Sequence, residues 1–171
     1  MRRFAFLTAV AVAAMLVVPS PASGGAAGID AAILGGLTDN YRGEGVFTPP
    51  QPISEQTARA RTRIGRMAEF EIKYENIDGG PDFYIVQGCR GNNKFAVQYR
   101  SNNNNVTSEV VDGDYETPLV ADGDDREDFE VKVKVKDNAD VGDIKKCKVT
   151  FESDFWGSTD SVRGKVKVKA G

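Results

Sequence analysis

Six lysines alternate with valine or glycine in two segments of this 171-residue chain, and they are the first candidates for binding chemistry. They are Lys132, Lys134 and Lys136 in one segment and Lys165, Lys167 and Lys169 in the other. A period of two places each set on the outward face of a β-strand. If the two strands are neighbours, six ammonium groups form a basic plate able to hold a polyanion such as an acidic polysaccharide. The simpler alternative, which the pattern favours, is that these lysines keep the sheets soluble and protect their edges.

Acidic side chains gather in several predicted turns, where carboxylates could hold a hard cation. Asp137, Asp140 and Asp143 are the best candidates for a calcium site, since Ca²⁺ prefers several oxygen ligands. Their spacing does not match the twelve-residue calcium loop, and Asp is also an ordinary turn residue. We therefore expect turns here and no cofactor.

Aromatic residues supply a third kind of candidate. Phe155 and Trp156 lie in the loop before the last predicted strand, and loops between strands often carry ligand contacts. The Trp ring could stack on a sugar or anchor a protein partner. Tyr99, near the polar segment 101–105, is a lesser candidate. The alternative, which is favoured because large aromatic rings are mostly buried, is that Phe155 and Trp156 cap the core.

The chain contains no histidine, and this absence restricts its chemistry. Ser-His-Asp and Cys-His catalysis, histidine-ligated metals and imidazole acid–base steps are all excluded. Carboxylates are numerous, but no spacing singles out a catalytic pair. We therefore expect a protein that is not an enzyme.

Two cysteines, Cys89 and Cys147, form an even pair in the part of the chain that follows the N-terminal apolar run. In an oxidising compartment such a pair predicts one disulfide. Two buried free thiols are the alternative.

The N-terminus has the layout of a Sec-type signal peptide over residues 1–22. Arg2 and Arg3 precede an apolar run from Phe4 to Val18, and Ser20 and Ala22 supply small residues before the predicted cut. The apolar run of about 15 residues is shorter than the roughly 20 that a membrane-spanning helix needs, although a retained anchor is the alternative. The pattern predicts a secreted or periplasmic bacterial protein.

Removal of the signal peptide changes the charge balance. Without Arg2 and Arg3, 20 basic residues stand against 25 acidic ones, a net charge of −5. An acidic exported domain has no general attraction to nucleic acid. No later segment is apolar enough to cross a membrane, so we expect no integral membrane segment after cleavage.

The segments before residue 67 give weaker signals. Residues 23–38 are rich in Gly and Ala and predict a flexible tether. Residues 43–48 predict a first strand that ends at the following prolines. Residues 54–66 predict an exposed connection, with either one helical turn or an extended edge segment.

From Met67 onward the side chains alternate between apolar and polar with a period of two, which predicts half-buried strands. The predicted strands are 67–75, 83–89, 95–99, 106–111, 115–120, 129–136, 146–151 and 162–168. Segments 83–89 and 95–99 predict a hairpin, and Pro118 favours an edge position for its strand. Gly164, on the inward parity of the last strand, predicts a bulge or close packing.

Many short alternating strands separated by turns, with no convincing helix, are typical of a β-sandwich. The fold class predicted for residues 39–171 is therefore all-β: an immunoglobulin-like antiparallel β-sandwich of about 7–9 strands with one disulfide. Cys89 and Cys147 share the inward parity of their strands, so both thiols should point into the core.

Several turn motifs also occur in the order seen in a known kind of module. They are Tyr41-Arg42-Gly43, Asn76 with Gly79, Val106-Thr107, Gly113-Asp114-Tyr115-Glu116-Thr117, Gly123-Asp124, and Ser153 with Asp160 and Val162. From Asp39 onward the chain thus resembles the CARDB-like immunoglobulin-type repeats of exported bacterial proteins. The resemblance implies a structural or ligand-presenting role.

Together these observations predict a secreted, non-catalytic structural or adhesion module of the cell exterior or periplasm. The alternative is a small ligand-binding module, for carbohydrate through the Trp156 loop or for a polyanion through the lysine-rich strands. The expected partner is a cell-envelope protein or polysaccharide.

Overall fold

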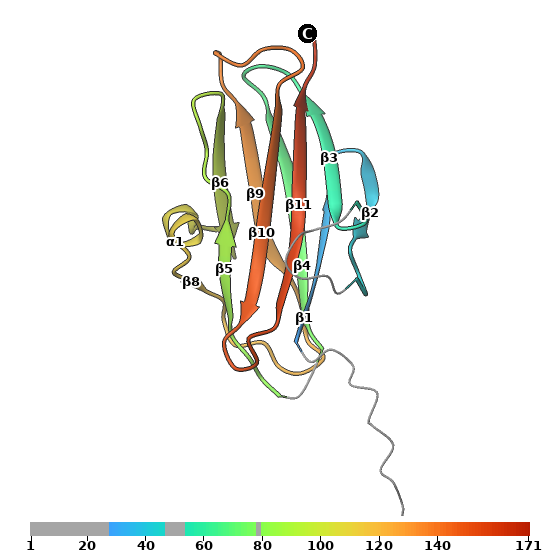
Figure 1. Cartoon of the computed structure of the whole chain (residues 1–171), viewed down its shortest axis with the longest axis vertical. Helices are drawn as coiled ribbons and strands as arrows, with labels where there is room; N and C mark the ends of the chain where they lie inside the picture. Colours follow the sequence, from blue (N-terminus) through green and yellow to red (C-terminus); the bar gives the residue numbers. More distant parts are fainter. Residues whose placement is uncertain (1–27, 47–53, 78–79) are drawn as a thin grey trace, which may run out of the picture.

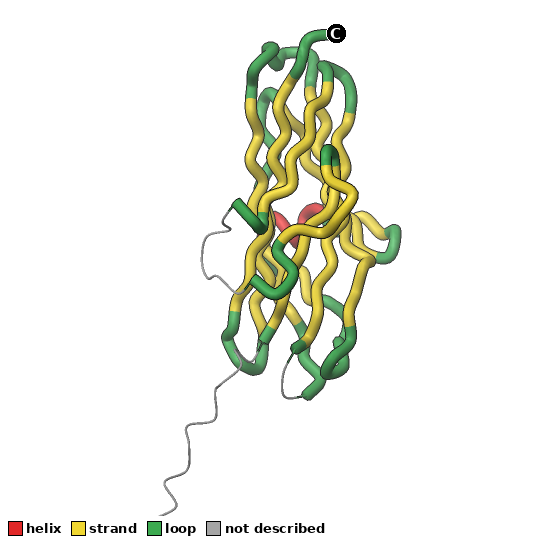
Figure 2. Tube along the Cα trace, turned by 90° about the vertical axis from the view of Figure 1, so that its right-hand side faces the viewer, coloured by secondary structure: helices red, strands yellow, loops and turns green. Residues whose placement is uncertain are grey.

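Two β-sheets pack face to face and run along the long axis of the molecule (Figures 1 and 2). The computed structural model describes residues 28–46, 54–77 and 80–171. Within these residues there are eleven strands and one short helix. The predicted all-β sandwich is confirmed. Within the same ranges no helix is long and apolar enough to cross a membrane.

The first sheet has six strands in the order β2-β1-β4-β9-β6-β7, and every pairing in it is antiparallel. Its strands are β1 (Ile29–Gly35), β2 (Thr38–Arg42), β4 (Met67–Asn76), β6 (Phe95–Ser101), β7 (Asn104–Asn105) and β9 (Asp125–Val135). Strands β4 and β9 form its centre.

The second sheet has five strands in the order β3-β11-β10-β5-β8. Its strands are β3 (Thr57–Thr62), β5 (Tyr84–Gly88), β8 (Tyr115–Glu116), β10 (Ile144–Ser153) and β11 (Thr159–Val168). Strands β3 and β11 are parallel, and the other pairs are antiparallel.

The strand order is that of an immunoglobulin-like sandwich. The series β1-β4-β9-β6 corresponds to strands A, B, E and D of that fold, and β11-β10-β5 corresponds to G, F and C. Each sheet buries one face against the other, and for that reason the side chains of β4 and β9 alternate between buried and exposed positions.

Aromatic rings fill the space between the sheets. Tyr74 of β4 stacks on Phe151 of β10 with ring centroids 5.0 Å apart, and Phe129 of β9 meets Phe151 edge-on at 5.6 Å. Gly164 of β11 leaves room for the Phe70 ring, since a Cβ at this position would lie 3.1 Å from it. The β10–β11 register is unbroken around Gly164, so no bulge forms there. Of the two features predicted for Gly164, a bulge or close packing, the structure has close packing.

Strand β1 corrects the prediction of a flexible tether over residues 23–38. Ile29, Ala31 and Ile33 are buried, and the strand pairs along its whole length with β4. Residues 29–33 are buried on both faces, so they show no alternation that would reveal a strand. Residues 23–27, like the predicted signal peptide, lie outside the described residues.

A buried carboxylate joins β1 to the second sheet. Asp160 of β11 is 1% exposed and accepts hydrogen bonds from the backbone N–H of Ala31 (2.8 Å), the side-chain amide of Gln56 (2.7 Å) and the backbone N–H of Ser161 (2.7 Å). These bonds connect three separate segments of the chain at one edge of the sandwich. Burial raises the pKa of Asp160 to about 6, and the nearby Asp30 carboxyl adds to the increase.

Three local predictions are also wrong. Residues 106–111, predicted as a strand, lie mostly in the helix α1 (Thr107–Asp112), which buries only Val110. The predicted hairpin of segments 83–89 and 95–99 does not form, because β5 and β6 belong to different sheets. The strand predicted at 43–48 does not form in its described part, residues 43–46, because β2 ends at Arg42; residues 47 and 48 lie outside the described residues.

Two uncertain segments turn out to be edge strands. Residues 54–66 contain the edge strand β3, so the extended alternative is the right one. In the segment predicted at 115–120, only β8 forms, and it lies at the other edge of the same sheet, as Pro118 suggested.

Candidate functional site

The outer surface of the five-stranded sheet carries a group of cations, which we call the basic face. It consists of the outward side chains Arg59 and Arg61 of β3, Arg163, Lys165 and Lys167 of β11, and Lys146 and Lys148 of β10. The small inward residues Ala58 and Ala60 let β3 lie close against the core while its arginines point to solvent.

The register of the three strands sets these cations in rows. Lys165 lies opposite Arg59 on one side and Lys146 on the other. Paired strands are separated by about 4.8 Å, and alternate residues along a strand by about 6.6 Å. The basic face is therefore a lattice of positive charges whose spacing is fixed by the sheet.

Apart from Lys148, which has a partner, the cations of the basic face are uncompensated by the described carboxylates. The salt bridges identified within the described residues form at Lys73, Arg90, Lys94, Arg126 and Lys132, which lie outside this face. Arg59, Lys146 and Lys165 make no salt bridge with a described carboxylate, and the same is true of Arg61, Arg163 and Lys167. Such cations remain available to an anionic ligand.

A shallow depression crosses the basic face where β3, β11 and β10 meet. Its lining includes Leu37 and Ile144 beside the cations Arg59, Lys165 and Lys167. Leu37 is 64% exposed and Ile144 is 46% exposed, so the depression combines positive charge with apolar surface.

The plate predicted from the two lysine segments does not form. Lys132 and Lys134 belong to β9 of the six-stranded sheet, whereas Lys165 and Lys167 belong to β11 of the opposite sheet. Lys132 lies 3.1 Å from Glu130 and 3.4 Å from Glu69, which compensate its charge.

Strands β3 and β10, rather than β9, supply the neighbours of the β11 lysines. The sequence signal for β3 was the alternation of Arg59 and Arg61 with alanines, which is weak because Ala contributes little apolar surface.

The loop between β10 and β11 presents its aromatic rings to solvent. Phe155 is 64% exposed and Trp156 is 56% exposed, so the favoured prediction that they cap the core is wrong. Ser153 Oγ accepts a 2.9 Å hydrogen bond from the Trp156 backbone N–H and donates to the buried carboxylate of Asp82. The loop backbone is thus anchored while its rings project outward.

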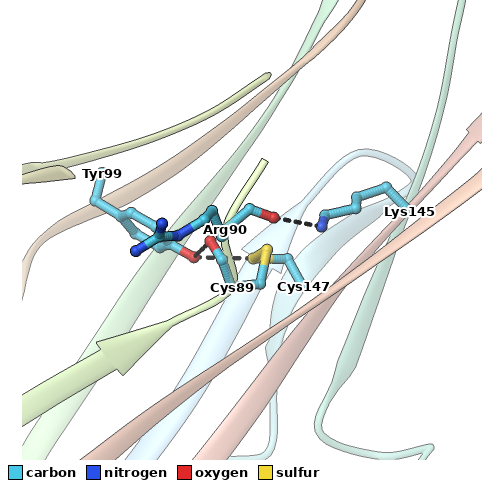
Figure 3. Close-up of a disulfide and its surroundings, with 5 residues drawn as sticks. All are labelled: Cys89, Arg90, Tyr99, Lys145 and Cys147. Carbon is cyan, nitrogen blue, oxygen red and sulfur yellow. Dashed lines mark hydrogen bonds between the residues drawn. A yellow bond between two sulfur atoms is a disulfide. The ribbon is translucent and has the colours of Figure 1, made fainter. Parts of the chain in front are cut away.

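Tyr99 is not a surface residue, which corrects its assignment as a ligand contact. Its ring is fully buried, and its hydroxyl donates a 2.9 Å hydrogen bond to the Cys89 carbonyl and lies 3.0 Å from Cys147 Sγ (Figure 3). Burial raises the pKa of the Tyr99 hydroxyl, so it stays protonated.

The predicted disulfide between Cys89 and Cys147 is confirmed, with a Cα–Cα distance of 5.1 Å. Cys147 lies in β10 and Cys89 directly follows β5, so the bond links neighbouring strands of one sheet and not the two sheets. Nearby, Lys145 Nζ donates a 2.6 Å hydrogen bond to the Arg90 carbonyl (Figure 3), and burial lowers the pKa of Lys145.

The acidic loop predicted as a calcium candidate contains an ion-pair cluster. Lys94 Nζ lies 2.9 Å from Asp140 and 2.8 Å from Asp143, and this pairing lowers the pKa of Asp143. Asp137 is exposed. No group of three or more acidic, cysteine or histidine side chains arranged to hold a metal occurs in the part of the chain that the structure describes.

Comparisons with known proteins give no family assignment. No protein family model matches the chain, and no curated protein sequence matches it. The resemblance to CARDB-like repeats therefore stays a prediction.

Solved structures similar to this chain are distant. One is the VesB protease of Vibrio cholerae, with a TM-score of 0.42 and 14% identity over 67% of this chain and 30% of that one. Another is a family 123 glycoside hydrolase from Clostridium perfringens, with a TM-score of 0.44 and 11% identity over 82% of this chain and 27% of that one. This chain thus spans about a third or less of either protein. A third is the N-terminal domain of PorA, with a TM-score of 0.38, 12% identity, and coverage of 82% and 98%.

Proposed function

We propose that this protein is an exported, non-catalytic β-sandwich module that binds an acidic polysaccharide of the cell exterior through its basic face. The observation that carries the proposal is the row of Arg59, Lys165 and Lys146 on three adjacent strands, none of which has a described carboxylate partner. The disulfide and the predicted signal peptide support export, because disulfides persist in oxidising compartments.

A repeating polymer fits the basic face better than a small anion. The cations are distributed over three strands and do not converge on a single point, so a ligand must carry several separated charges to contact them together. The sheet also fixes the strand positions before binding, which reduces the entropy lost on association. The ligand class is therefore a polymer with regularly spaced carboxylates or sulfates.

The negative net charge of the chain does not oppose this function at short range. At physiological ionic strength the charge of distant groups is screened over about 8 Å. Many exposed carboxylates, such as Asp122 and Asp154, lie in loops at the end of the molecule beyond the basic face. A polymer on the basic face therefore experiences mainly the local positive field.

The test compares two triple variants, each of which removes three positive charges. Arg59→Ala with Lys146→Ala and Lys165→Ala removes the central row of the basic face. Lys132→Ala with Lys134→Ala and Lys136→Ala removes the same charge from the opposite sheet. Both are applied to immobilised sulfated and uronate polysaccharides, with inorganic polyphosphate as a further probe, and the salt concentration for elution is measured.

We expect the first triple variant to lose retention and the second to elute close to the unmodified protein. Release should occur at lower salt in the first variant because fewer counterions are displaced on binding. Equal retention of both variants would show that only net charge matters and would refute the proposed site. Retention on polyphosphate alone would assign the basic face to a phosphate polymer and refute the polysaccharide.

A further inference from the structure

The two ends of the sandwich carry opposite charge. The end that holds the β10–β11 loop, at the bottom of Figure 1, has exposed carboxylates at Asp122, Asp124, Glu152 and Asp154. The opposite end, near the label C, has the exposed cations Arg61, Arg63, Arg66, Lys167 and Lys169. They outnumber the exposed carboxylates Asp137 and Asp140 of the β9–β10 loop, and Asp140 is paired with Lys94.

Each end also has exposed apolar side chains. On the acidic end Phe155 and Trp156 project from the anchored loop, and we call these two rings the aromatic knob. On the basic end Val141 is 62% exposed. Ile64, in the loop between β3 and β4, and Met67, at the start of β4, are also exposed.

The basic end has a hollow of about 280 Å³ that could receive an aromatic ring. It is lined by Arg61, Val141, Gly142, Lys167, Val168 and Lys169. Backbone hydrogen bonds hold its wall in place, from Gly142 N to the Val168 carbonyl and from Lys169 N to the Thr62 carbonyl, both 2.9 Å. We call this feature the cationic hollow.

From this complementarity we infer that the partner of the aromatic knob is the cationic hollow of a second copy of the chain. Trp and Phe rings bind Lys and Arg side chains through their π faces, and Val141 adds apolar contact. The carboxylates beside the knob, Glu152 and Asp154, then face the cations around the hollow. Opposite signs at the two surfaces favour the encounter.

The two surfaces lie at opposite ends of one molecule, so the contact is head to tail and does not close on itself. A heterologous contact of this kind produces linear chains of molecules, whereas a symmetric contact stops at a dimer. The cationic hollow shares Arg61 and Lys167 with the basic face, but the head-to-tail contact requires no polysaccharide.

The test uses one variant for each surface. Phe155→Ser with Trp156→Ser removes the knob, and Val141→Glu places a carboxylate in the hollow. Asn138→Asp is the matched control, because it adds the same charge to the same exposed loop outside the hollow lining. Sedimentation velocity of each purified protein over a range of concentrations, at low and high salt, measures association, and circular dichroism checks that each variant is folded.

We expect the unmodified protein and Asn138→Asp to form a concentration-dependent ladder of oligomers that shrinks at high salt. Each surface variant alone should remain a monomer. An equimolar mixture of the two should form dimers and nothing larger, because one supplies an intact hollow and the other an intact knob.

Three outcomes overturn the inference. The first is an unmodified protein that stays monomeric at every concentration. The second is dimerisation of either surface variant alone, which indicates a symmetric contact. The third combines two results: the equimolar mixture does not associate, and Trp156 fluorescence changes when neutral oligosaccharides are added. Together these results would assign the aromatic knob to a sugar ligand.

Discussion

The side-chain amide of Gln56 donates a 2.7 Å hydrogen bond to the carboxylate of Asp160, although 104 residues separate them. Asp160 is buried, so water cannot replace this bond, and it also holds the backbone of Ala31. A single carboxyl thus joins β1, β11 and the segment before β3. Its ionisation should influence the stability of the whole edge of the sandwich.

We predict that unfolding free energy falls as the pH rises from about 4 to 7, because of Asp160. Burial raises the folded pKa from 3.8 to about 6, so the contribution is fully present below 3.8 and is lost as the pH passes through about 6. A shift of this size corresponds to roughly 2–3 kcal/mol, at about 1.4 kcal/mol per pKa unit. Urea titrations at several pH values measure it.

Asp160→Asn isolates this effect from the other carboxyls. The Asn side chain stays neutral at every pH, so the unfolding free energy of this variant should change less between pH 4 and 7. Asp154→Asn, at an exposed position in the adjoining loop, should keep the slope of the unmodified protein. An unchanged slope in Asp160→Asn would exclude this carboxyl as the source.

Two buried tyrosines should respond in opposite ways to loss of the hydroxyl. The Tyr84 hydroxyl has no hydrogen-bond partner among the described residues, so Tyr84→Phe should be neutral or stabilise by up to about 1 kcal/mol. Tyr99→Phe removes the bond to the Cys89 carbonyl and should destabilise by about 1 kcal/mol. Denaturant unfolding of the pair measures both. A loss of stability in Tyr84→Phe would reveal a hidden partner for that hydroxyl.

The disulfide should contribute a substantial part of the stability. A crosslink between residues 58 positions apart restricts the unfolded chain by about 4 kcal/mol in the loop-entropy model. Cys89→Ala with Cys147→Ala should therefore lower the unfolding free energy by that order. Reduced unmodified protein serves as the control and should unfold at a similar denaturant concentration. Equal stability of oxidised and reduced protein would contradict the prediction.

The single tryptophan should report an exposed site. Because Trp156 is 56% exposed, dilute protein should emit at long wavelength and be quenched readily by acrylamide. Emission typical of a buried indole at low concentration would contradict the loop geometry. Phe155→Ser is the control, since it should leave the position of the emission maximum almost unchanged.

The alternation of apolar and polar residues predicted those strands that bury one face and expose the other face to solvent. Strands β4, β9, β10 and β11 meet this condition, and all four were found from the sequence. Strand β1 does not meet it, because residues 29–33 are buried on both sides and many of them are small. The six-residue helix α1 is too short to display a helical period.

The residues that make up the candidate site depend on which strands are neighbours. The alternation of apolar and polar residues along a strand does not reveal its neighbours. The lysines of β9 and β11 show the same pattern, yet they point away from each other on opposite sheets. Sheet membership is set by long-range packing, so the sequence identified the β11 lysines but missed Arg59 and Arg61 beside them. The exposure of Trp156 was missed for a related reason, because the bonds of Ser153 and Asp82 that anchor its loop are contacts between distant segments.

The first described strand and the last strand leave the sandwich at opposite ends (Figure 1). Tension applied between Gly28 and Lys169 would pull β1 and β11 lengthwise against their neighbours, so their ladders of hydrogen bonds would be sheared together and not opened one by one. Force along the long axis is therefore shared by many hydrogen bonds of these ladders at once, which is the geometry expected of a mechanically resistant domain.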